Sequence, residues 1–375
     1  LLAAPAARAA EAIDPFYVAS PEELRGAPGT LIRSEPMEGA PLAAAAWRIL
    51  YRSTDPAGAP IAVSGVAVIP RTPPPAGGRP IVAWAHPTSG LVQHCAPSLA
   101  NFVFQQMSGL RDMMEHGYIV AATDYPGLGT EGVHPYLVGD SEARAVLDSA
   151  RAARALPAAE AGSRVGLWGH SQGGQAVLFA GIIGRSYAPD LDIVGVAAAA
   201  PATELGALLI DDFARPGGKN LLAMTLWSWS RIYDIPLNTV VDPAAMPAID
   251  RLAKQCIESP VDIEPRARIA KELEQRFLIV DNLVDREPWL TWLRRNTVGT
   301  LPPSLPVFLA QGLDDTTVDP PVTLAYMKRL CAAGSRVDLL ELPDVGHALV
   351  GAKASRPMVD WMAARFAGEP APDDC

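Results

Sequence analysis

The 375-residue sequence has no long apolar run, no basic cluster and no dinucleotide-binding motif. No stretch of about 18 apolar residues is free of polar breaks, so we predict no transmembrane segment. Acidic residues outnumber basic ones, 41 to 31, and no Lys/Arg cluster offers a surface for phosphates, which excludes nucleic acid as a predicted partner. No G-x-G-x-x-G pattern follows a strand with an acidic residue downstream, so we predict no cofactor.

Cysteines are few, and none of the four belongs to a C-x-x-C pair, so the sequence predicts no metal site and no thioredoxin-like chemistry. Four cysteines allow three pairings. We prefer Cys95–Cys256 and Cys331–Cys375, because Cys375 could join the last helix to the preceding one, and the other pairings stay open. Disulfides fit an oxidising compartment.

The opening residues 1–10 are rich in Leu and Ala and resemble the end of a secretory signal, with cleavage near Ala9 or Ala10. We therefore interpret residues 1–15 as a signal remnant or a disordered N-terminus. The alternative is an ordinary Ala-rich terminus. The expected location is secreted or periplasmic.

Strand and helix patterns alternate along the first half of the chain and predict an α/β fold with a mostly parallel sheet covered by helices on both faces. The Pro- and Gly-rich segment 70–80 suggests a hairpin between the first two strands. Apolar runs predict strands at 62–69, 80–85, 118–122 and 192–197. Helical spacing of apolar residues predicts a helix at 141–155.

The pattern changes over residues 203–301, which contain many prolines and four tryptophans and show no clear strand. Strand and helix patterns then resume, with strands at 306–310 and 336–340 and helices at 322–332 and 356–366. We interpret 203–301 as a helical cap or lid inserted into an α/β-hydrolase core formed by 16–202 and 302–375. The alternative is a second domain unrelated to catalysis.

The segment 169–174 reads Gly-His-Ser-Gln-Gly-Gly and lies between the apolar run 164–168 and a predicted helix. G-x-S-x-G between a strand and a helix is the nucleophile elbow of α/β-hydrolases, which predicts that Ser171 is the nucleophile. The same fold requires an acid and then a histidine later in the chain. His347 is the one histidine after Ser171, in a predicted loop.

The acid is expected just after the strand at 306–310, where Asp314, Asp315 and Asp319 follow one another. The spacing G-x-x-D-x-x-V selects Asp315, and Asp314 remains a competitor. An oxyanion hole needs two donors aimed at the developing charge. We predict the backbone N–H of Gln172 as one donor and Thr88 as the other, because the preceding Pro87 has no N–H.

Apolar side chains of the insertion suggest a pocket for an acyl or aromatic group, with packing between cap and core as the alternative. His86 is expected to line the substrate site as a packing and orienting residue. We expect Asp124 to fix a turn and His134 to lie at the pocket rim. The pocket candidates in the insertion are Trp227, Trp229, Leu221, Leu222 and Met224.

Three segments together resemble the secretory lipases, the lipase A-like branch of the α/β-hydrolases. They are 83–90 leading to 94–98, 123–130 with Pro135 and Tyr136, and 169–174. The resemblance implies a secreted esterase or lipase with a helical cap inserted before the acid, two disulfides, no cofactor, and a triad of Ser171, Asp315 and His347. The chain has His86-Pro87 where many lipases have His-Gly.

The sequence thus predicts a serine carboxylic-ester hydrolase that acts through an acyl-enzyme on apolar acyl or aryl esters, as a carboxylesterase or triacylglycerol lipase. Its partner would be a small-molecule or lipid ester, and contact with a lipid interface is left open, as is the oligomeric state. One alternative is a short-chain acetyl or aryl esterase or a polyester hydrolase. A more remote one is a non-catalytic binding protein on the same fold.

Overall fold

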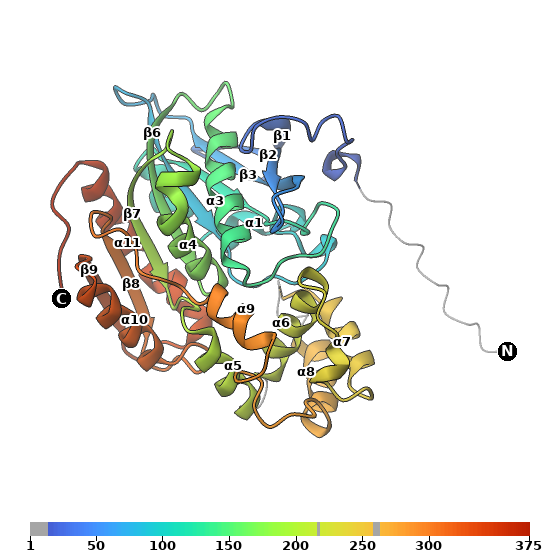
Figure 1. Cartoon of the computed structure of the whole chain (residues 1–375). Coiled ribbons are helices and arrows are strands. Elements are labelled where there is room, and N and C mark those ends of the chain that lie inside the picture. The colour runs from blue at the N-terminus through green and yellow to red at the C-terminus, as the bar shows by residue number, and fades with distance from the viewer. Residues whose placement is uncertain (1–13, 216–217, 258–262) are drawn as a thin grey trace.

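A computed structural model describes residues 14–215, 218–257 and 263–375 (Figure 1). The predicted signal remnant falls largely on residues 1–13, outside the described residues. Asp14 and Pro15, at the end of that predicted segment, belong to the fold. The side chain of Asp14 accepts a hydrogen bond from the N–H of Phe16 at the start of the 3-10 helix η1 (Pro15–Tyr17), whose aromatic residues are buried.

One mixed sheet forms the centre of the described molecule, with the strand order β1-β2-β3-β5-β4-β6-β7-β8-β9. The pairs from β5 to β9 are parallel, and β1, β2, β3 and β5 pair antiparallel. The predicted fold class, a mostly parallel sheet with helices, is confirmed. The strands are β1 Leu31–Met37, β2 Ala44–Thr54, β3 Pro60–Pro70, β4 Arg79–Ala85, β5 Ile119–Thr123, β6 Ala161–His170, β7 Asp192–Ala199, β8 Val307–Gly312 and β9 Val337–Leu342.

The predicted hairpin between the strands at 62–69 and 80–85 is wrong. These strands are β3 and β4, and β5 lies between them, antiparallel to β3 and parallel to β4. Every residue of β4 is buried. A fully buried apolar strand needs a partner on each edge, and its own sequence does not say which strands these are.

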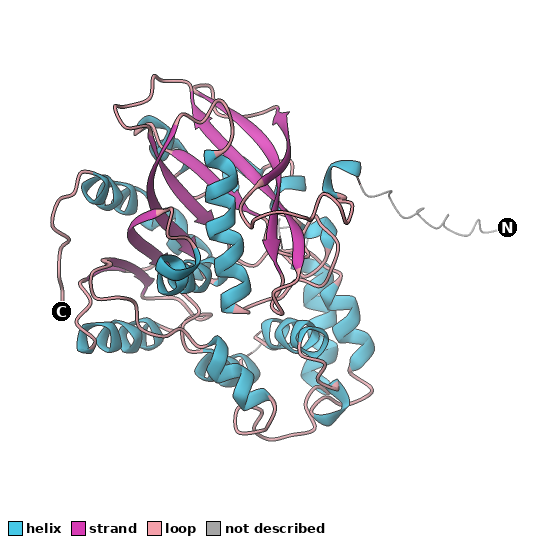
Figure 2. Ribbon diagram, turned by 45° about the horizontal axis from the view of Figure 1, so that its top comes forward, coloured by secondary structure: helices cyan, strands magenta, loops and turns pink. Residues whose placement is uncertain are grey.

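Helices cover both faces of the sheet (Figure 2). One face packs against α3, α4 and α10, and the other packs against α2 and α11. The bounds are η2 Gln93–Cys95, η3 Pro97–Leu99, α1 Val103–Gln106, α2 Leu110–Glu115, α3 Gly139–Arg154, α4 Gln172–Tyr187, α10 Pro320–Ala332 and α11 His347–Phe366.

Helix α11 begins nine residues earlier than the predicted helix at 356–366. Val350, Ala354 and Met358 are fully buried and recur every four residues, so one apolar face of α11 packs on the sheet. Pro357 lies inside this helix and obscures the pattern in the sequence, because proline usually marks a helix boundary.

Between β7 and β8 the chain forms helices below the carboxyl ends of the strands, coloured yellow-green to orange in Figure 1. These helices share one apolar core with the sheet, in which Leu222 and Trp229 occur together with Trp84 and Trp168. We refer to them as the cap. Its helices are α5 Leu205–Ala214, α6 Lys219–Ile232, η4 Leu237–Thr239, α7 Met246–Ala253, α8 Ile263–Gln275 and α9 Trp289–Asn296.

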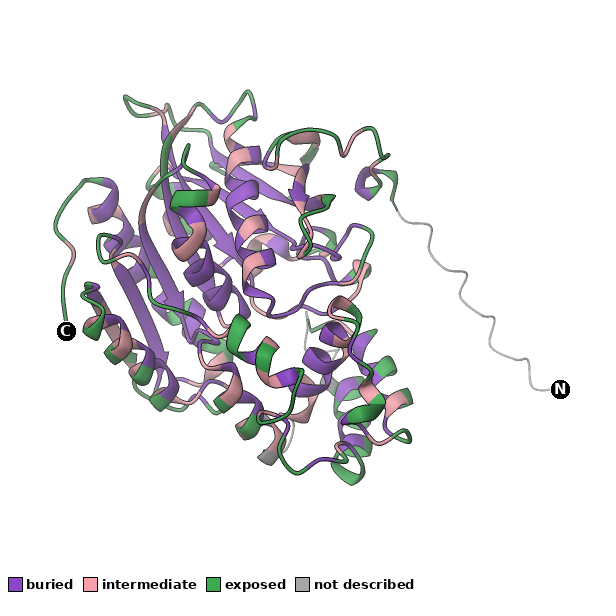
Figure 3. Ribbon diagram, viewed as in Figure 1, coloured by how far each residue is buried: buried purple, intermediate pink, exposed green. Residues whose placement is uncertain are grey.

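Two disulfides join distant segments, Cys95 to Cys256 and Cys331 to Cys375, and both are the pairs preferred from the sequence. The first links the end of η2, in the loop after β4, to the segment after cap helix α7. Figure 3 shows that the central strands are buried while the outer faces of the cap helices are exposed. Among the described helices, none has the length and apolar character needed to cross a membrane.

Candidate active site

Ser171 lies at the sharp turn between β6 and α4. Its backbone has a φ of 58°, in the left-handed region that non-glycine residues rarely adopt, and its N–H donates to the carbonyl of Ala199 at 2.9 Å. A side chain at Gly173 would collide with the carbonyl of Ala85 on the neighbouring strand, so the turn requires glycine there. The turn lifts the hydroxyl of Ser171 above the end of the sheet.

His347 connects Ser171 to a carboxylate. Its Nε2 lies 2.8 Å from Oγ of Ser171, and its Nδ1 lies 2.7 Å from Oδ2 of Asp315. The prediction that His347 sits in a loop is wrong, since it is the first residue of α11. The apolar face of that helix, anchored on the sheet, therefore sets where the imidazole stands.

Asp315 is fully buried and held by its own loop. Its Oδ1 accepts the N–H groups of Thr317 at 2.8 Å and Val318 at 2.9 Å, which leaves Oδ2 for the imidazole. The competitor Asp314 is exposed, and Asp319 instead pairs with Arg215. Two adjacent carboxylates thus point in different directions, and the one at position 315 faces His347.

Each of the two residues predicted as oxyanion donors lines a cavity that Ser171 also lines. Gln172 is the first residue of α4, so its N–H has no intrahelical acceptor. Thr88 lines the same cavity as Ser171, and its hydroxyl lies 2.9 Å from that of Tyr136. His86 is buried between the carbonyls of Pro87 and Asp124, and burial lowers its pKa to about 4, so it is neutral near pH 7.

Among the described residues, Ser171 lines two cavities. The larger has a volume of about 550 Å³, and the narrow one has a volume of about 30 Å³. A third cavity, of about 230 Å³, lies inside the cap, and Leu209 lines both it and the narrow cavity. The larger cavity is lined by His86, Thr88, Ser89, Gln105, Ile257 and His347 among others, and the narrow one by Gln172, Leu205, Leu208, Leu209, Leu221 and Thr225 among others.

Three of the predicted pocket residues lie elsewhere, because each is engaged by another side chain or carbonyl. Trp227 donates to Asp250, Trp229 is fully buried and donates to the carbonyl of Tyr136, and Met224 contacts Arg266. In the described part of the chain, none of them lines a cavity at Ser171. Of the other candidates, His86 lines the large cavity, Leu221 lines both cavities at Ser171, and Leu222 lines the cap cavity.

Helix α5, whose leucines line the narrow cavity, was not predicted from the sequence. The run Leu-Gly-Ala-Leu-Leu-Ile at 205–210 was the available signal, because it is the first strongly apolar run after the strand at 192–197. The pocket was predicted instead at tryptophans, because they are the largest apolar side chains of the insertion.

The predictions for Asp124 and His134 have different outcomes. Asp124 holds its loop, as expected, by accepting the N–H of Ser98 at 2.9 Å and the hydroxyl of Ser64 at 2.6 Å, and burial raises its pKa to about 6. His134 does not lie at the rim. It is fully buried, and burial lowers its pKa to about 3.

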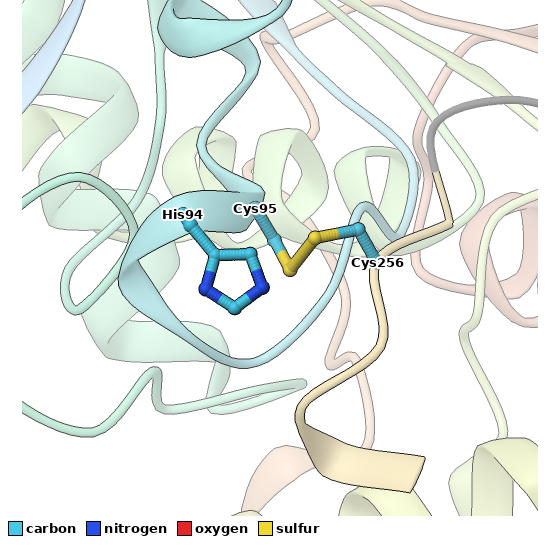
Figure 4. A group of neighbouring side chains, drawn as sticks. All are labelled: His94, Cys95 and Cys256. Atoms are coloured by element: carbon cyan, nitrogen blue, oxygen red, sulfur yellow. A yellow bond between two sulfur atoms is a disulfide. The ribbon is translucent and has the colours of Figure 1, made fainter. Parts of the chain in front are cut away.

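His94 lies beside the Cys95–Cys256 disulfide (Figure 4). A ring nitrogen of His94 and the sulfur atoms of Cys95 and Cys256 lie within 4.8 Å of one another. The thiolate form of cysteine is the metal ligand, and both sulfurs are joined in a disulfide, so we assign no metal site to this group.

The fold and the site define the class of an α/β-hydrolase with a serine, histidine and aspartate in hydrogen-bonded contact. The chain belongs to the secretory lipase family, whose model matches residues 93–374. The resemblance predicted from the sequence is therefore confirmed.

Individual relatives are distant. A protein of Mycobacterium tuberculosis named "Probable inactive lipase MT1628" is 26% identical over 96% of this chain and 83% of its own length. Lipase A of Moesziomyces aphidis is 24% identical over 62% of this chain, which spans about half (51%) of that relative. Among solved structures, Candida antarctica lipase A in its closed state superposes with a TM-score of 0.78 at 20% identity, covering 96% of this chain and 89% of that one. The rice cell wall degrading esterase LipA of Xanthomonas oryzae gives 0.74 at 20% identity, covering 92% and 100%. These structures support the fold.

Proposed function

We propose that this protein hydrolyses carboxylic esters with Ser171 as the nucleophile. The observation that carries the proposal is the continuous hydrogen-bonded line from Asp315 through His347 to Ser171, which opens on two cavities. Membership of the secretory lipase family supports ester hydrolysis as the reaction class.

The geometry fits acyl transfer in two halves. His347 Nε2 takes the proton of Ser171 as Oγ attacks the carbonyl carbon, and Asp315 stabilises the imidazolium. The N–H of Gln172 and the Thr88 segment stabilise the oxyanion. The imidazolium then gives its proton to the alcohol oxygen as that bond breaks. Water, deprotonated by His347, releases the acid from the acyl-enzyme.

The position of His347 indicates how the ester lies. The proton must pass from Nε2 to the leaving alcohol, and His347 lines the large cavity but is not among the residues around the narrow one. We therefore place the alcohol in the large cavity and the acyl group in the narrow, leucine-lined one. This arrangement favours short acyl groups on bulkier alcohols, the acetyl or aryl esterase alternative, over a true lipase.

The test is labelling by a p-nitrophenyl alkylphosphonate together with turnover of p-nitrophenyl acetate. We expect stoichiometric labelling of Ser171, and Ser171→Ala should lower kcat about 10⁴–10⁶-fold with unchanged folding. One relative is named a probable inactive lipase, so a non-catalytic protein is the competing outcome. Absence of labelling in the folded wild type would support that outcome and refute the proposal.

The two disulfides and the family support an extracellular location. Secretion through a cleaved signal at the N-terminus stays a proposal.

A further inference from the structure

A fully buried carboxyl group lies next to the residue proposed as an oxyanion donor. Glu142 belongs to the first turn of α3, and its Oε1 accepts the side-chain N–H of Gln172 at 2.7 Å and the backbone N–H of Leu137 at 2.9 Å. The mechanism above assigns no role to it. Gln172 follows the nucleophile directly, so Glu142 holds the side chain of the residue whose backbone N–H must face the oxyanion.

The surroundings of Glu142 lack a compensating positive charge. His134, at 4.0 Å, is neutral because burial lowers its pKa to about 3, and no Lys or Arg among the described residues forms an ion pair with Glu142. Two tyrosines interact electrostatically with Glu142: Tyr125 from the loop after β5 and Tyr233 from the end of α6. Asp140, in the same turn of α3, interacts with Tyr233. Arg295 of α9 acts on Tyr233.

Two buried oxygens of this cluster lack a hydrogen-bond donor in the part of the chain described, namely Oε2 of Glu142 and Oε1 of Gln172. An ionised Glu142 would leave a buried negative oxygen without a partner, whereas a proton on Oε2 turns one acceptor into a donor. The N-terminus of α3 favours negative charge, but by less than the cost of burying an unpaired carboxylate. Burial accordingly raises the pKa of Glu142 to about 8.

Glu142 also reaches the second oxyanion segment. The N–H that it accepts belongs to Leu137, which has a strained φ of 55°, and the adjacent Tyr136 contacts the hydroxyl of Thr88. Cap helix α6 holds the same tyrosine, because Ser228 accepts its N–H at 3.1 Å and Trp229 donates to its carbonyl at 2.8 Å. Glu142 therefore contacts Gln172 directly and reaches Thr88 through the loop that carries Tyr136 and Leu137.

We propose that Glu142, in its protonated form, is a positioning residue that aims the oxyanion donors at Ser171. This inference rests on the proposed ester hydrolysis. The neutral form matters for a second reason: a carboxylate beside Gln172 would repel the negative charge that develops on the ester oxygen in the transition state.

The experiment compares the pH dependence of kcat for wild type, Glu142→Gln and Glu142→Ala on p-nitrophenyl acetate, with Ser171→Ala as the blank. Glu131→Gln serves as the matched control, because it removes the same group from an exposed position in the preceding loop. In the wild type and in Glu131→Gln, kcat should fall above pH 8 as Glu142 ionises. In Glu142→Gln that fall should vanish, with kcat at pH 7 within about threefold of wild type. Glu142→Ala should lower kcat about 10²-fold with KM within twofold, the loss typical of one misplaced donor.

The outcomes separate the two claims. If the wild type shows no turnover above Ser171→Ala, the proposed function fails, and with it the role of Glu142. If the turnover depends on Ser171 but Glu142→Gln keeps the alkaline fall, the positioning role alone is overturned. The comparison with Glu142→Gln decides the matter even if Glu142→Ala does not fold.

Discussion

Ser171 adopts a backbone conformation that few residues tolerate, and its neighbours explain why it persists. The N–H and the carbonyl of Ser171 are both bonded, to Ala199 and to the N–H groups of Gln175 and Ala202. Gly169 and Gly173 approach each other so closely that a side chain on the first would strike the carbonyl of the second. Strain at this residue is held by surrounding contacts, which is typical of a site whose geometry matters for function.

The choice between two adjacent carboxylates gives a prediction at the same scale. Asp315→Asn should lower kcat/KM about 10⁴-fold, because an amide at this position would favour the wrong tautomer of His347. Asp314→Asn should stay within twofold of wild type, since Asp314 is exposed. The measurement is kcat/KM on p-nitrophenyl acetate, with circular dichroism to check folding. Equal losses in the two variants would contradict the assignment.

Among the elements, α5 has the most direct influence on the proposed acyl site. Its leucines line the narrow cavity, and ion pairs fix both of its ends to the region of α10: Glu204 with Arg329, and Arg215 with Asp319. A helix held at both ends gives the cavity a defined width. Leu209 lies between the narrow cavity and the cavity of about 230 Å³ inside the cap, because it lines both.

Removing the Leu209 side chain should therefore lengthen the acyl site. We expect Leu209→Ala to raise the ratio of kcat/KM for p-nitrophenyl hexanoate over acetate by about tenfold, the lower end of the effect of one further methylene in an apolar pocket (about 10–200-fold). The control is Leu42→Ala, which truncates a fully exposed leucine between β1 and β2. An unchanged ratio in a folded Leu209→Ala would show that the acyl group binds elsewhere.

Across the whole molecule, buried ionisable groups set the pH dependence of stability in two opposite directions. Burial lowers the pKa of His86 to about 4 and those of His134 and His170 to about 3. Below pH 6.5 these histidines become protonated in the unfolded chain but stay neutral in the folded one. The free energy of unfolding therefore falls as the pH drops towards 4. Burial raises the pKa of Asp124 from 3.8 to about 6 and that of Glu142 from 4.5 to about 8. Between these values the folded state holds a proton that the unfolded state has lost, so stability falls as the pH rises from the lower to the higher pKa of each group.

Above pH 6.5 the histidines and Asp124 contribute little further change, and Glu142 dominates this group. We expect the free energy of unfolding to decrease between pH 6.5 and 8 by at most about 1.4 kcal/mol per pH unit, the limit for one proton. Glu142→Gln should abolish that decrease. The measurement is urea unfolding of wild type and Glu142→Gln at pH 6.5 and 8. An equal change in the free energy of unfolding between the two pH values in both proteins would show that Glu142 already ionises at neutral pH.

The sequence by itself determined the features that local pattern encodes. The elbow around Ser171 needs glycines at set positions, the order of serine, acid and histidine is a property of the chain, and the turn spacing around Asp315 selects one carboxylate of two. Apolar runs and helical spacing likewise predicted strands β3 to β9, the helices α3, α4 and α10, part of α11, and the α/β class, because each depends on residues a few positions apart.

Tertiary structure alone decided what depends on residues far apart in the chain. It placed β5 between β3 and β4, began α11 at His347 despite Pro357, and formed the narrow cavity from α5 rather than from the tryptophans of the cap. It also buried Glu142 against Gln172, although an acidic residue in a first helical turn is normally solvated. The physical reason is common to all four: burial and strand partners are set by whichever distant segments pack there, and a local pattern carries no record of them.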